Sequence, residues 1–266
     1  MTPTGNDHTT ETARGGEIHA RSDVGETRET NEDAVLATSL TDDSDLLAVA
    51  DGMGGHQSGE IASATALSSF ESALRAGLAT DELDGDTDTP ADSDCNRETL
   101  LRYAAAEANA ELEAAAASGS SLDNMGTTLV AALLEGQTAT LVNIGDSRAY
   151  HVSSDDVDQL TVDHSLVQEL VESGTLTPAE ARDHPQRNVI TQSLGPGSEI
   201  NPDTDTVDVG GTLLLCSDGL TEELSDGAIK EIVGAADDPA TITERLVERA
   251  NENGGSDNIS VVVAVR

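Results

Sequence analysis

Positive charge and aromatic side chains are scarce in this 266-residue chain. Lysine and arginine together number 13, against 51 aspartates and glutamates, so the formal net charge is −38. Without a basic patch to neutralise phosphates, nucleic acid is not expected as a partner. The chain has no tryptophan, two tyrosines and one phenylalanine, so we expect a core built from valine, leucine, isoleucine and alanine.

The chain also has little of what marks secreted or membrane proteins. Its two cysteines, Cys95 and Cys216, are too few for a disulfide framework and fit a reducing compartment. Residues 1–17 are polar and do not resemble a signal peptide, and no segment is long and apolar enough to span a bilayer. We therefore expect a cytoplasmic protein without a membrane partner. A monomer is expected as well, although no feature of the sequence determines the oligomeric state.

Acidic residues are abundant, and two explanations apply to them. Their even spread from one end of the chain to the other favours solvation of the whole surface in the salt-rich cytosol of a halophilic cell. A partner with a basic surface is the alternative.

Hydrophobic periodicity divides the chain into a tail and one domain. Residues 1–17, rich in Thr, Gly and Glu, are predicted to be a disordered tail, and residues 18–266 to form the domain. Strands are expected over residues 18–24, 34–40, 46–50, 127–134, 138–144, 149–152, 212–216 and 259–265. Helices are expected over residues 58–78 and 97–117, within 164–194, and from Ser225 and Pro239. Strands in runs and helices in pairs favour antiparallel sheets covered by helices.

Two segments interrupt this pattern. Residues 79–96 combine Gly, Thr and Pro with many acids and are predicted to form an acidic loop insertion. Residues 164–194 are predicted to contain short helices separated by turns. Two capping boxes are expected there, formed by Ser165 with Gln168 and by Thr177 with Glu180.

Five short acidic clusters stand out from the general acidity because each is flanked by Gly, Asn or Ser. They are Asn31-Glu32-Asp33, Asp51-Gly52-Met53-Gly54-Gly55-His56, Gly145-Asp146-Ser147-Arg148, Ser217-Asp218-Gly219 and Gly255-Ser256-Asp257-Asn258. Several follow or precede an apolar run, so a folded sheet would bring them together. Gathered carboxylates are the ligands that Mg²⁺ and Mn²⁺ prefer, which makes a metal-dependent hydrolase the leading hypothesis. Taken singly, each cluster also fits a glycine-rich turn with a solvated aspartate.

Arg28 is a candidate for binding an anionic substrate. It lies beside the first acidic cluster in a chain poor in cations, and a guanidinium group matches the oxygens of a phosphate. A surface ion pair with Glu29 or Glu32 explains this residue equally well.

In their order along the chain, these motifs resemble the PPM, or type 2C, metal-dependent protein serine/threonine phosphatases in their bacterial form. The similarity runs from about residue 17 to the C-terminus, apart from residues 79–96. The matching segments are Ser22-Asp23-Val24-Gly25 through Arg28, the five acidic clusters, and Gly126-Thr127-Thr128. Residues 164–194 are similar to the flap of bacterial-type members, on the basis of Asp163-His164-Ser165-Leu166-Val167, His184-Pro185 and Asn188-Val189-Ile190-Thr191.

The resemblance implies an α+β fold, a four-layer αββα sandwich of two antiparallel sheets flanked by helices, with two Mn²⁺ or Mg²⁺ ions at one end. The implied metal ligands are Asp51, which would bridge both ions, Asp218 and Asp257 on the first ion, and the Gly52 carbonyl on the second. Asp146, with Asp218, matches the place where some bacterial members bind a third ion. Glu32 and Asp33 would hold metal-bound waters, and Arg28 would clamp the substrate phosphate.

The implied reaction is hydrolysis of phosphoserine and phosphothreonine in proteins that a serine/threonine kinase has phosphorylated. A metal-bridging water would attack phosphorus directly, with no covalent enzyme intermediate. Eukaryotic members carry a histidine directly after the Asp-Gly pair, where this chain has Met53. A metal-bound water is therefore the preferred acid for the leaving oxygen, with His56 as the nearest side-chain candidate.

Other chemistries fit the sequence less well. Cys216 does not match a cysteine-phosphatase loop, because Glu222 stands where that loop carries its arginine. Asp203-Thr204-Asp205-Thr206-Val207 spells the nucleophile pattern of haloacid-dehalogenase-like phosphatases but does not follow an apolar strand. Asp84, Asp86 and Asp88 imitate the start of an EF-hand loop that lacks its glycine and final glutamate.

Two alternatives within the same fold stay open. The first is a catalytically silent member that only binds phosphoproteins, although no metal carboxylate of the pattern is missing. The second is a phosphatase restricted to one regulatory partner.

Overall fold

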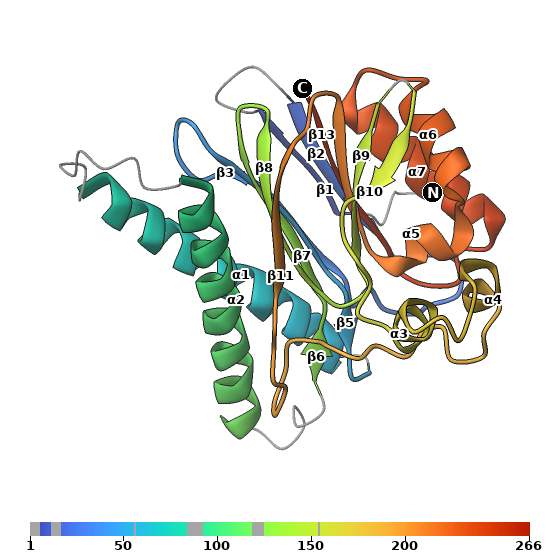
Figure 1. The fold of residues 1–266 in the computed structure, drawn as a ribbon, viewed down its shortest axis with the longest axis horizontal. Helices are drawn as coiled ribbons and strands as arrows, with labels where there is room; N and C mark the ends of the chain where they lie inside the picture. Colours follow the sequence, from blue (N-terminus) through green and yellow to red (C-terminus); the bar gives the residue numbers. More distant parts are fainter. Residues whose placement is uncertain (1–5, 12–16, 56, 84–92, 119–124, 154) are drawn as a thin grey trace.

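Two antiparallel sheets packed face to face form the centre of the structure, a computed structural model that describes residues 6–11, 17–55, 57–83, 93–118, 125–153 and 155–266 (Figure 1). The first sheet has the order β1 (Asn6–Glu11), β2 (Glu17–Asp23), β13 (Ile259–Val265), β12 (Thr212–Cys216), β9 (Arg148–Val152) and β10 (Val157–Gln159). The second has the order β11 (Asp203–Asp208), β8 (Thr138–Ile144), β7 (Leu129–Glu135), β4 (Asp45–Ala50) and β3 (Ala34–Ser39). A small separate ladder pairs β5 (Gly52–Met53) with β6 (Gly126–Thr127).

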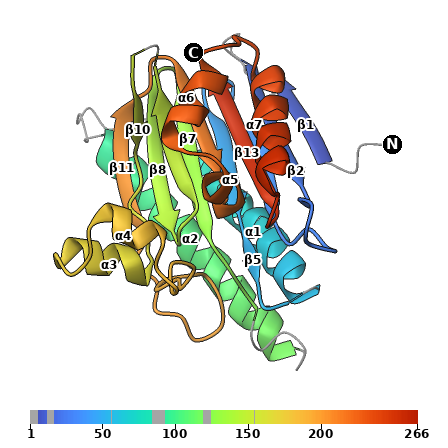
Figure 2. The same ribbon diagram turned by 90° about the vertical axis from the view of Figure 1, so that its right-hand side faces the viewer.

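Helices cover the outer face of each sheet. The long helices α1 (Gln57–Leu83) and α2 (Ser93–Ser118) pack on the second sheet, whereas α5 (Asp218–Glu223), α6 (Asp226–Val233) and α7 (Pro239–Asn253) pack on the first (Figures 1 and 2). Two short helices, α3 (Leu166–Glu172) and α4 (Pro178–Arg182), lie beside one end of the sheets. The predicted four-layer αββα sandwich is therefore confirmed.

Three apolar layers hold the four layers together, and single strands contribute to two of them at once. In β4 every residue is buried. Leu46, Ala48 and Ala50 face α1 and α2, while Leu47 and Val49 face the other sheet. Alternate side chains point to opposite faces of a strand, so a strand covered on both sides reads as a continuous apolar run.

The structure differs from the predicted disordered tail over residues 6–11. These residues form β1, an edge strand antiparallel to β2, with Asn6 opposite Ser22 and Glu11 opposite Glu17. Backbone hydrogen bonds to the free edge of β2 are open to any sequence, so the polar composition of the segment did not reveal the strand.

The two long helices extend into the segment 79–96 that was predicted to be a loop. Helix α1 continues to Leu83 and α2 begins at Ser93. Ala, Glu and Leu near the end of α1 are good helix formers, and their tendency exceeds the loop signal of the neighbouring acids. Residues 84–92, including the EF-hand-like Asp84, Asp86 and Asp88, lie outside the described residues.

Residues 164–194, expected to be the flap, contain the helices and caps that their sequence predicts, with one exception. The capping box at the start of α4 is complete, because Thr177 accepts from the Glu180 N–H and Glu180 accepts from the Thr177 N–H. At α3 only half of the box forms. Ser165 accepts from the Gln168 N–H, but the Gln168 side chain donates to Glu172.

The described helices include none that could cross a membrane, since each is too short or too polar for that purpose.

Candidate active site

Three acidic residues lie at one end of the strands of the second sheet. β3 and β4 are antiparallel with Ala34 opposite Ala50, so Asp33, which precedes β3, lies next to Asp51, which follows β4. Asp146 follows β8 at the same end, and its carboxylate repels that of Asp51. This end of the strands is at the bottom of the sandwich in Figure 1, near β5.

The first sheet adds two more acids to the same place. Asp218 follows β12 and is the first residue of α5, and Asp257 lies two residues before β13. β12 and β13 are antiparallel neighbours, so these two acids lie close together. The Asp218 and Asp257 carboxylates repel each other, and both repel that of Asp33. The structure thus brings together the Asp33, Asp51, Asp146, Asp218 and Asp257 side chains, as the sequence predicted.

The pKa values of four of these carboxyl groups, Asp33, Asp51, Asp146 and Asp218, are raised, first by burial and then by repulsion from neighbouring acids. Burial raises the pKa of Asp33 to about 7, of Asp146 to about 8 and of Asp218 to about 6. The pKa of Asp51 is raised well above its ordinary value by burial and by its acidic neighbours, Asp33 foremost. Such a group of acids needs either protons or a cation to be stable.

Several oxygens in the cluster fit a cation. The Oδ1 atoms of Asp33, Asp146 and Asp218 are buried and have no hydrogen-bond partner among the described residues. In the part of the chain that the structure describes, no group of three His, Cys, Asp or Glu side chains is placed so that it could hold an ion by itself. An ion here would therefore take part of its coordination from water, as Mg²⁺ usually does.

Hydroxyl groups fix the acids from behind. The Asp51 N–H donates to Thr128 Oγ1 at 2.9 Å, and the Thr127 hydroxyl donates to the Asp51 carbonyl at 2.9 Å. The Thr128 hydroxyl also pairs with the Ser147 hydroxyl at 2.7 Å. On the first sheet, the Ser217 hydroxyl donates to Asp33 Oδ2 at 2.9 Å. These contacts hold the Asp51 backbone and one Asp33 carboxylate oxygen, whereas Asp33 Oδ1 has no hydrogen-bond partner among the described residues.

Two glycines allow the backbone to approach closely. A Cβ atom on Gly52 would lie 2.2 Å from the Gly59 carbonyl oxygen, and one on Gly219 would lie 2.1 Å from the Asn258 carbonyl oxygen. Both distances are too short for any side chain, so these glycines are required by packing next to Asp51 and Asp218.

Arg28 lies at the rim of the cluster with a partner different from those expected. Its Nη2 donates to Asp257 Oδ2 at 2.6 Å, whereas the sequence indicated Glu29 or Glu32 as the partner of a surface ion pair. The guanidinium side chain is 52% exposed. Its loop is anchored to the Asp257 loop, because the Glu26 N–H donates to the Gly255 carbonyl at 2.8 Å.

Glu32 is held on the other side of this rim. Its backbone N–H donates to Asn258 Oδ1 at 2.9 Å, and its carboxylate lies against Gly59 in the first turn of α1. The positive end of the α1 dipole favours a carboxylate at that position. His56, the side-chain candidate for the acid, lies outside the described residues.

Comparison with known proteins identifies the family of the chain. The family model described as protein phosphatase 2C matches residues 25–261. The chain belongs to the protein phosphatase 2C family. By class it is a protein serine/threonine phosphatase.

Relatives of this 2C-family phosphatase match it over nearly its whole length. The serine/threonine phosphatase stp of Listeria innocua is 36% identical over 94% of this chain and 96% of its own. The protein phosphatase PhpP of Streptococcus pneumoniae is 40% identical over 93% of this chain and 96% of its own.

Solved structures agree with the sequence relatives. Serine/threonine phosphatase Stp1 from Staphylococcus aureus has a TM-score of 0.83 at 32% identity, over 97% of this chain and 98% of its own. The catalytic domain of the serine threonine protein phosphatase PstP, solved in complex with two manganese ions, has a TM-score of 0.74 at 36% identity, over 98% of this chain and 99% of its own. Metal binding is thus a property of a structural relative of this phosphatase.

The rejected chemistries can be compared with the fold of the phosphatase. Cys216 is fully buried in β12, and burial raises the pKa of its thiol to about 12, so it packs and does not react. The segment that resembles a haloacid-dehalogenase nucleophile forms the edge strand β11, and Asp203 at its start pairs with His164.

Sequence reasoning assigned no roles to the groups that hold the acids in place. Asn258 is the clearest case, because its amide donates to the Val24 and Thr30 carbonyls and its oxygen accepts from Glu32. A polar residue adjacent to an acid of the cluster, such as Ser217 beside Asp218 or Asn258 beside Asp257, was the available signal.

Proposed function

We propose that this phosphatase hydrolyses phosphoserine and phosphothreonine in proteins with two Mn²⁺ or Mg²⁺ ions held by the acidic cluster. The observation that carries the proposal is the group of buried, mutually repelling carboxylates with unpartnered oxygens at the meeting point of both sheets. Asp51, Asp218, Asp257 and the Gly52 carbonyl would hold the ions, and Asp146 with Asp218 a third. When bound, such ions lower the pKa of water and offset charge on phosphoryl oxygens.

The side chains around the cluster have distinct parts in this proposal. Asp33, with one oxygen fixed by Ser217, would orient water through its other oxygen. Glu32 would do the same from the first turn of α1. Arg28 uses one N–H on Asp257 and is half exposed, so its other donors would bind the phosphate oxygens of the substrate.

The reaction needs no nucleophile from the protein. Water would attack phosphorus, and the leaving seryl or threonyl oxygen would take its proton from water in the site. The inert, buried Cys216 fits this proposal. The substrates would be phosphoproteins made by a serine/threonine kinase in the cytoplasm, and the phosphatase would act as a monomer.

The test is hydrolysis of p-nitrophenyl phosphate with Mn²⁺ in high salt. We expect Mn²⁺-dependent turnover of the wild-type chain and a loss of about 100-fold or more in Asp218→Asn, which removes a proposed ligand charge. Asp237→Asn is the matched control, because Asp237 is an exposed loop acid outside the cluster, and it should keep full activity.

Two outcomes would contradict the proposal in different ways. A folded wild-type chain without Mn²⁺-dependent turnover would support a binding-only member of the fold. Turnover of p-nitrophenyl phosphate with only one phosphopeptide accepted from a diverse panel would instead support the partner-restricted phosphatase.

A further inference from the structure

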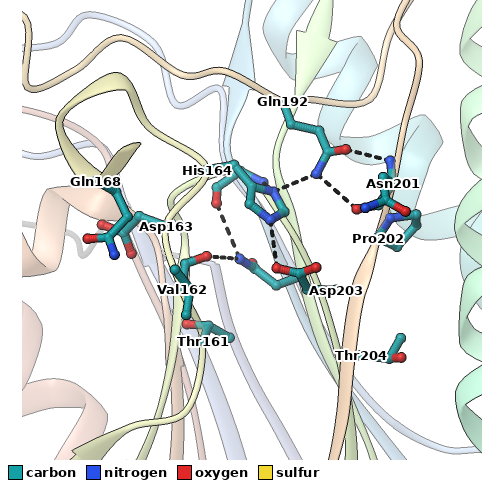
Figure 3. A network of polar contacts seen from close by, with 12 residues as sticks. Thr161, Val162, Asp163, His164, Gln168, Gln192, Asn201, Pro202, Asp203 and Thr204 are labelled. Carbon is teal, nitrogen blue, oxygen red and sulfur yellow. Dashed lines mark hydrogen bonds and ion pairs between the residues drawn. The ribbon is translucent and has the colours of Figure 1, made fainter. Parts of the chain in front are cut away.

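A histidine joins the two ends of the flap to the rest of the site. His164 stands at the start of the flap, Gln192 near its end, and Asp203 at the start of β11, and their side chains meet in one network (Figure 3). The His164 ring is largely enclosed, with 14% of its side chain exposed. None of these three residues has a part in the reaction proposed above.

Gln192 has a fixed orientation in this network. Its Oε1 accepts the Asn201 N–H, and its Nε2 donates to the Asn201 carbonyl at 3.1 Å. The amide cannot be turned over without losing both bonds. Its Nε2 therefore also acts as the donor in the 2.7 Å contact with His164 Nδ1 (Figure 3).

The hydrogen bonds determine which nitrogen of His164 carries the proton. Nδ1 accepts from Gln192 and also from the Gly145 N–H at 3.1 Å. Two donors directed at one nitrogen require a lone pair there, so the ring proton is on Nε2. Nε2 then donates to Asp203 Oδ2 at 3.0 Å.

The contact with Gly145 links the flap to the acidic cluster. Gly145 directly precedes Asp146, and the backbone N–H of His164 donates to the Gly145 carbonyl at 2.9 Å. On the other side of Asp146, Arg148 forms a two-point ion pair with Asp163 at 2.9 and 2.7 Å. Asp163, directly before the flap, and His164, its first residue, therefore hold the turn of residues 145–148 from both sides.

This turn has little freedom to move by itself. Gly145 has a φ of 111°, and a Cβ atom there would lie 2.6 Å from Thr128 Cγ2. Thr128 also accepts the Asp51 N–H. Because Thr128 is itself held by the Asp51 backbone, a displacement at His164 would act on the position of Asp146.

We propose that His164 is a positioning residue, whose Nε2-protonated ring holds both ends of the flap against the turn of residues 145–148 and thereby fixes the Asp146 carboxylate for cation binding. This inference rests on the proposed role of Asp146. Groups that orient metal ligands through hydrogen bonds typically change metal affinity by about 10–100-fold when removed.

The central experiment is a double-mutant cycle on Mn²⁺ binding, measured by isothermal titration calorimetry in high salt. We expect His164→Ala to weaken Mn²⁺ binding about tenfold, and to have no further effect in an Asp146→Ala background. His164→Asn, whose Oδ1 can accept the Gly145 N–H, should recover part of the affinity. If the two substitutions instead weaken Mn²⁺ binding independently, so that their fold-changes in affinity multiply in the double variant, the proposal is overturned.

The tautomer supplies a readout that simple packing would not change. Nitrogen-15 NMR of the wild-type ring should show an unprotonated Nδ1 and a protonated Nε2, and a protonated Nδ1 would overturn the assignment. His151→Ala is the matched control, since His151 on β9 contacts the Gly210 carbonyl away from the flap. It should bind Mn²⁺ like the wild type, and circular dichroism should show all variants folded.

The outcomes separate this inference from the proposed function. A wild-type chain that binds Mn²⁺ but does not turn over substrate overturns the proposed reaction and leaves the cycle decisive for His164. A wild-type chain that does not bind Mn²⁺ overturns both. If the wild-type chain turns over substrate and His164→Ala binds Mn²⁺ as tightly as the wild type, only the positioning role of His164 is overturned.

Discussion

At the scale of single residues, the site combines buried acids with very few cations. Arg28 is paired with Asp257 on the rim, and Arg148 is engaged by Asp163 behind the cluster. Burial, and then repulsion among the acids, raises the pKa values of Asp33, Asp146 and Asp218. The same arrangement that would hold divalent cations in the proposed reaction therefore weakens the fold whenever these acids are ionised without them.

These raised pKa values predict how the free energy of unfolding depends on pH in protein treated with a chelator. In the unfolded chain the carboxyls have their ordinary pKa, close to 4, whereas in the folded chain the pKa of Asp33 is about 7 and that of Asp146 about 8. Between about pH 4 and 8 the folded chain holds more protons, so the free energy of unfolding falls as the pH rises. Urea denaturation at constant salt and a series of pH values measures this free energy.

Two controls make this pH prediction specific. Asp146→Asn, which cannot ionise, should flatten the upper part of the fall. Mn²⁺ should reverse it, with the largest stabilisation at the highest pH, because the ligands must lose their protons to bind metal. A free energy of unfolding that stays constant or rises between about pH 5 and 8 contradicts the prediction.

At the scale of elements, the apolar strands were predictable and the polar ones were not. β4 and β13 lie between two layers and read as continuous apolar runs, so both strands were visible in the sequence. β1 and β11 are edge strands with polar sequences, and their pairing depends on backbone bonds that leave no sequence signal. α5 was missed because its six residues begin inside the acidic motif at Asp218.

The site was predictable to a similar degree. Acids at strand ends could be grouped from the sequence because strand ends of one sandwich meet. Their supports could not, since the partners are far apart in the chain: Thr128 supports Asp51, and Ser217 supports Asp33. Such pairs are determined by the packing of sheets and loops, which local periodicity does not report.

The start of α5 offers a prediction at the element scale. Gly219→Ala would place a Cβ 2.1 Å from the Asn258 carbonyl oxygen and force α5 away from the Asp257 loop. We expect destabilisation of about 1–3 kcal/mol and loss of Mn²⁺-dependent turnover, because Asp218 moves with the helix. Thermal unfolding and p-nitrophenyl phosphate hydrolysis measure the two effects.

Gly227→Ala is the matched control for this change. Gly227 is the second residue of α6, as Gly219 is of α5, but the nearest atom to its Cβ would be Ser225 Oγ at 4.0 Å. Alanine there should be neutral or stabilise by up to about 1 kcal/mol, with activity retained. Equal effects of the two substitutions would contradict the steric explanation.

At the scale of the whole molecule, the formal charge of −38 controls how the fold responds to salt. The Debye length falls from about 10 Å at 0.1 M salt to about 3 Å at 1 M, so repulsion among surface acids is strong only at low salt. We expect the unfolding temperature to rise with KCl, by about 2–4 °C for each kcal/mol of repulsion removed. Differential scanning calorimetry provides the measurement.

A charge-reduced variant separates screening from other effects of salt. Glu111, Glu244 and Glu248 are exposed on α2 and α7, and the last two are four residues apart on one helix, where like charges repel. Their joint replacement by glutamine should stabilise the chain at low salt, and the advantage should vanish near 1 M because the removed repulsion is already screened. Salt acting through preferential exclusion would raise both proteins equally and preserve the difference between them. A constant difference would therefore show that the acidity of this phosphatase does not limit its stability through repulsion.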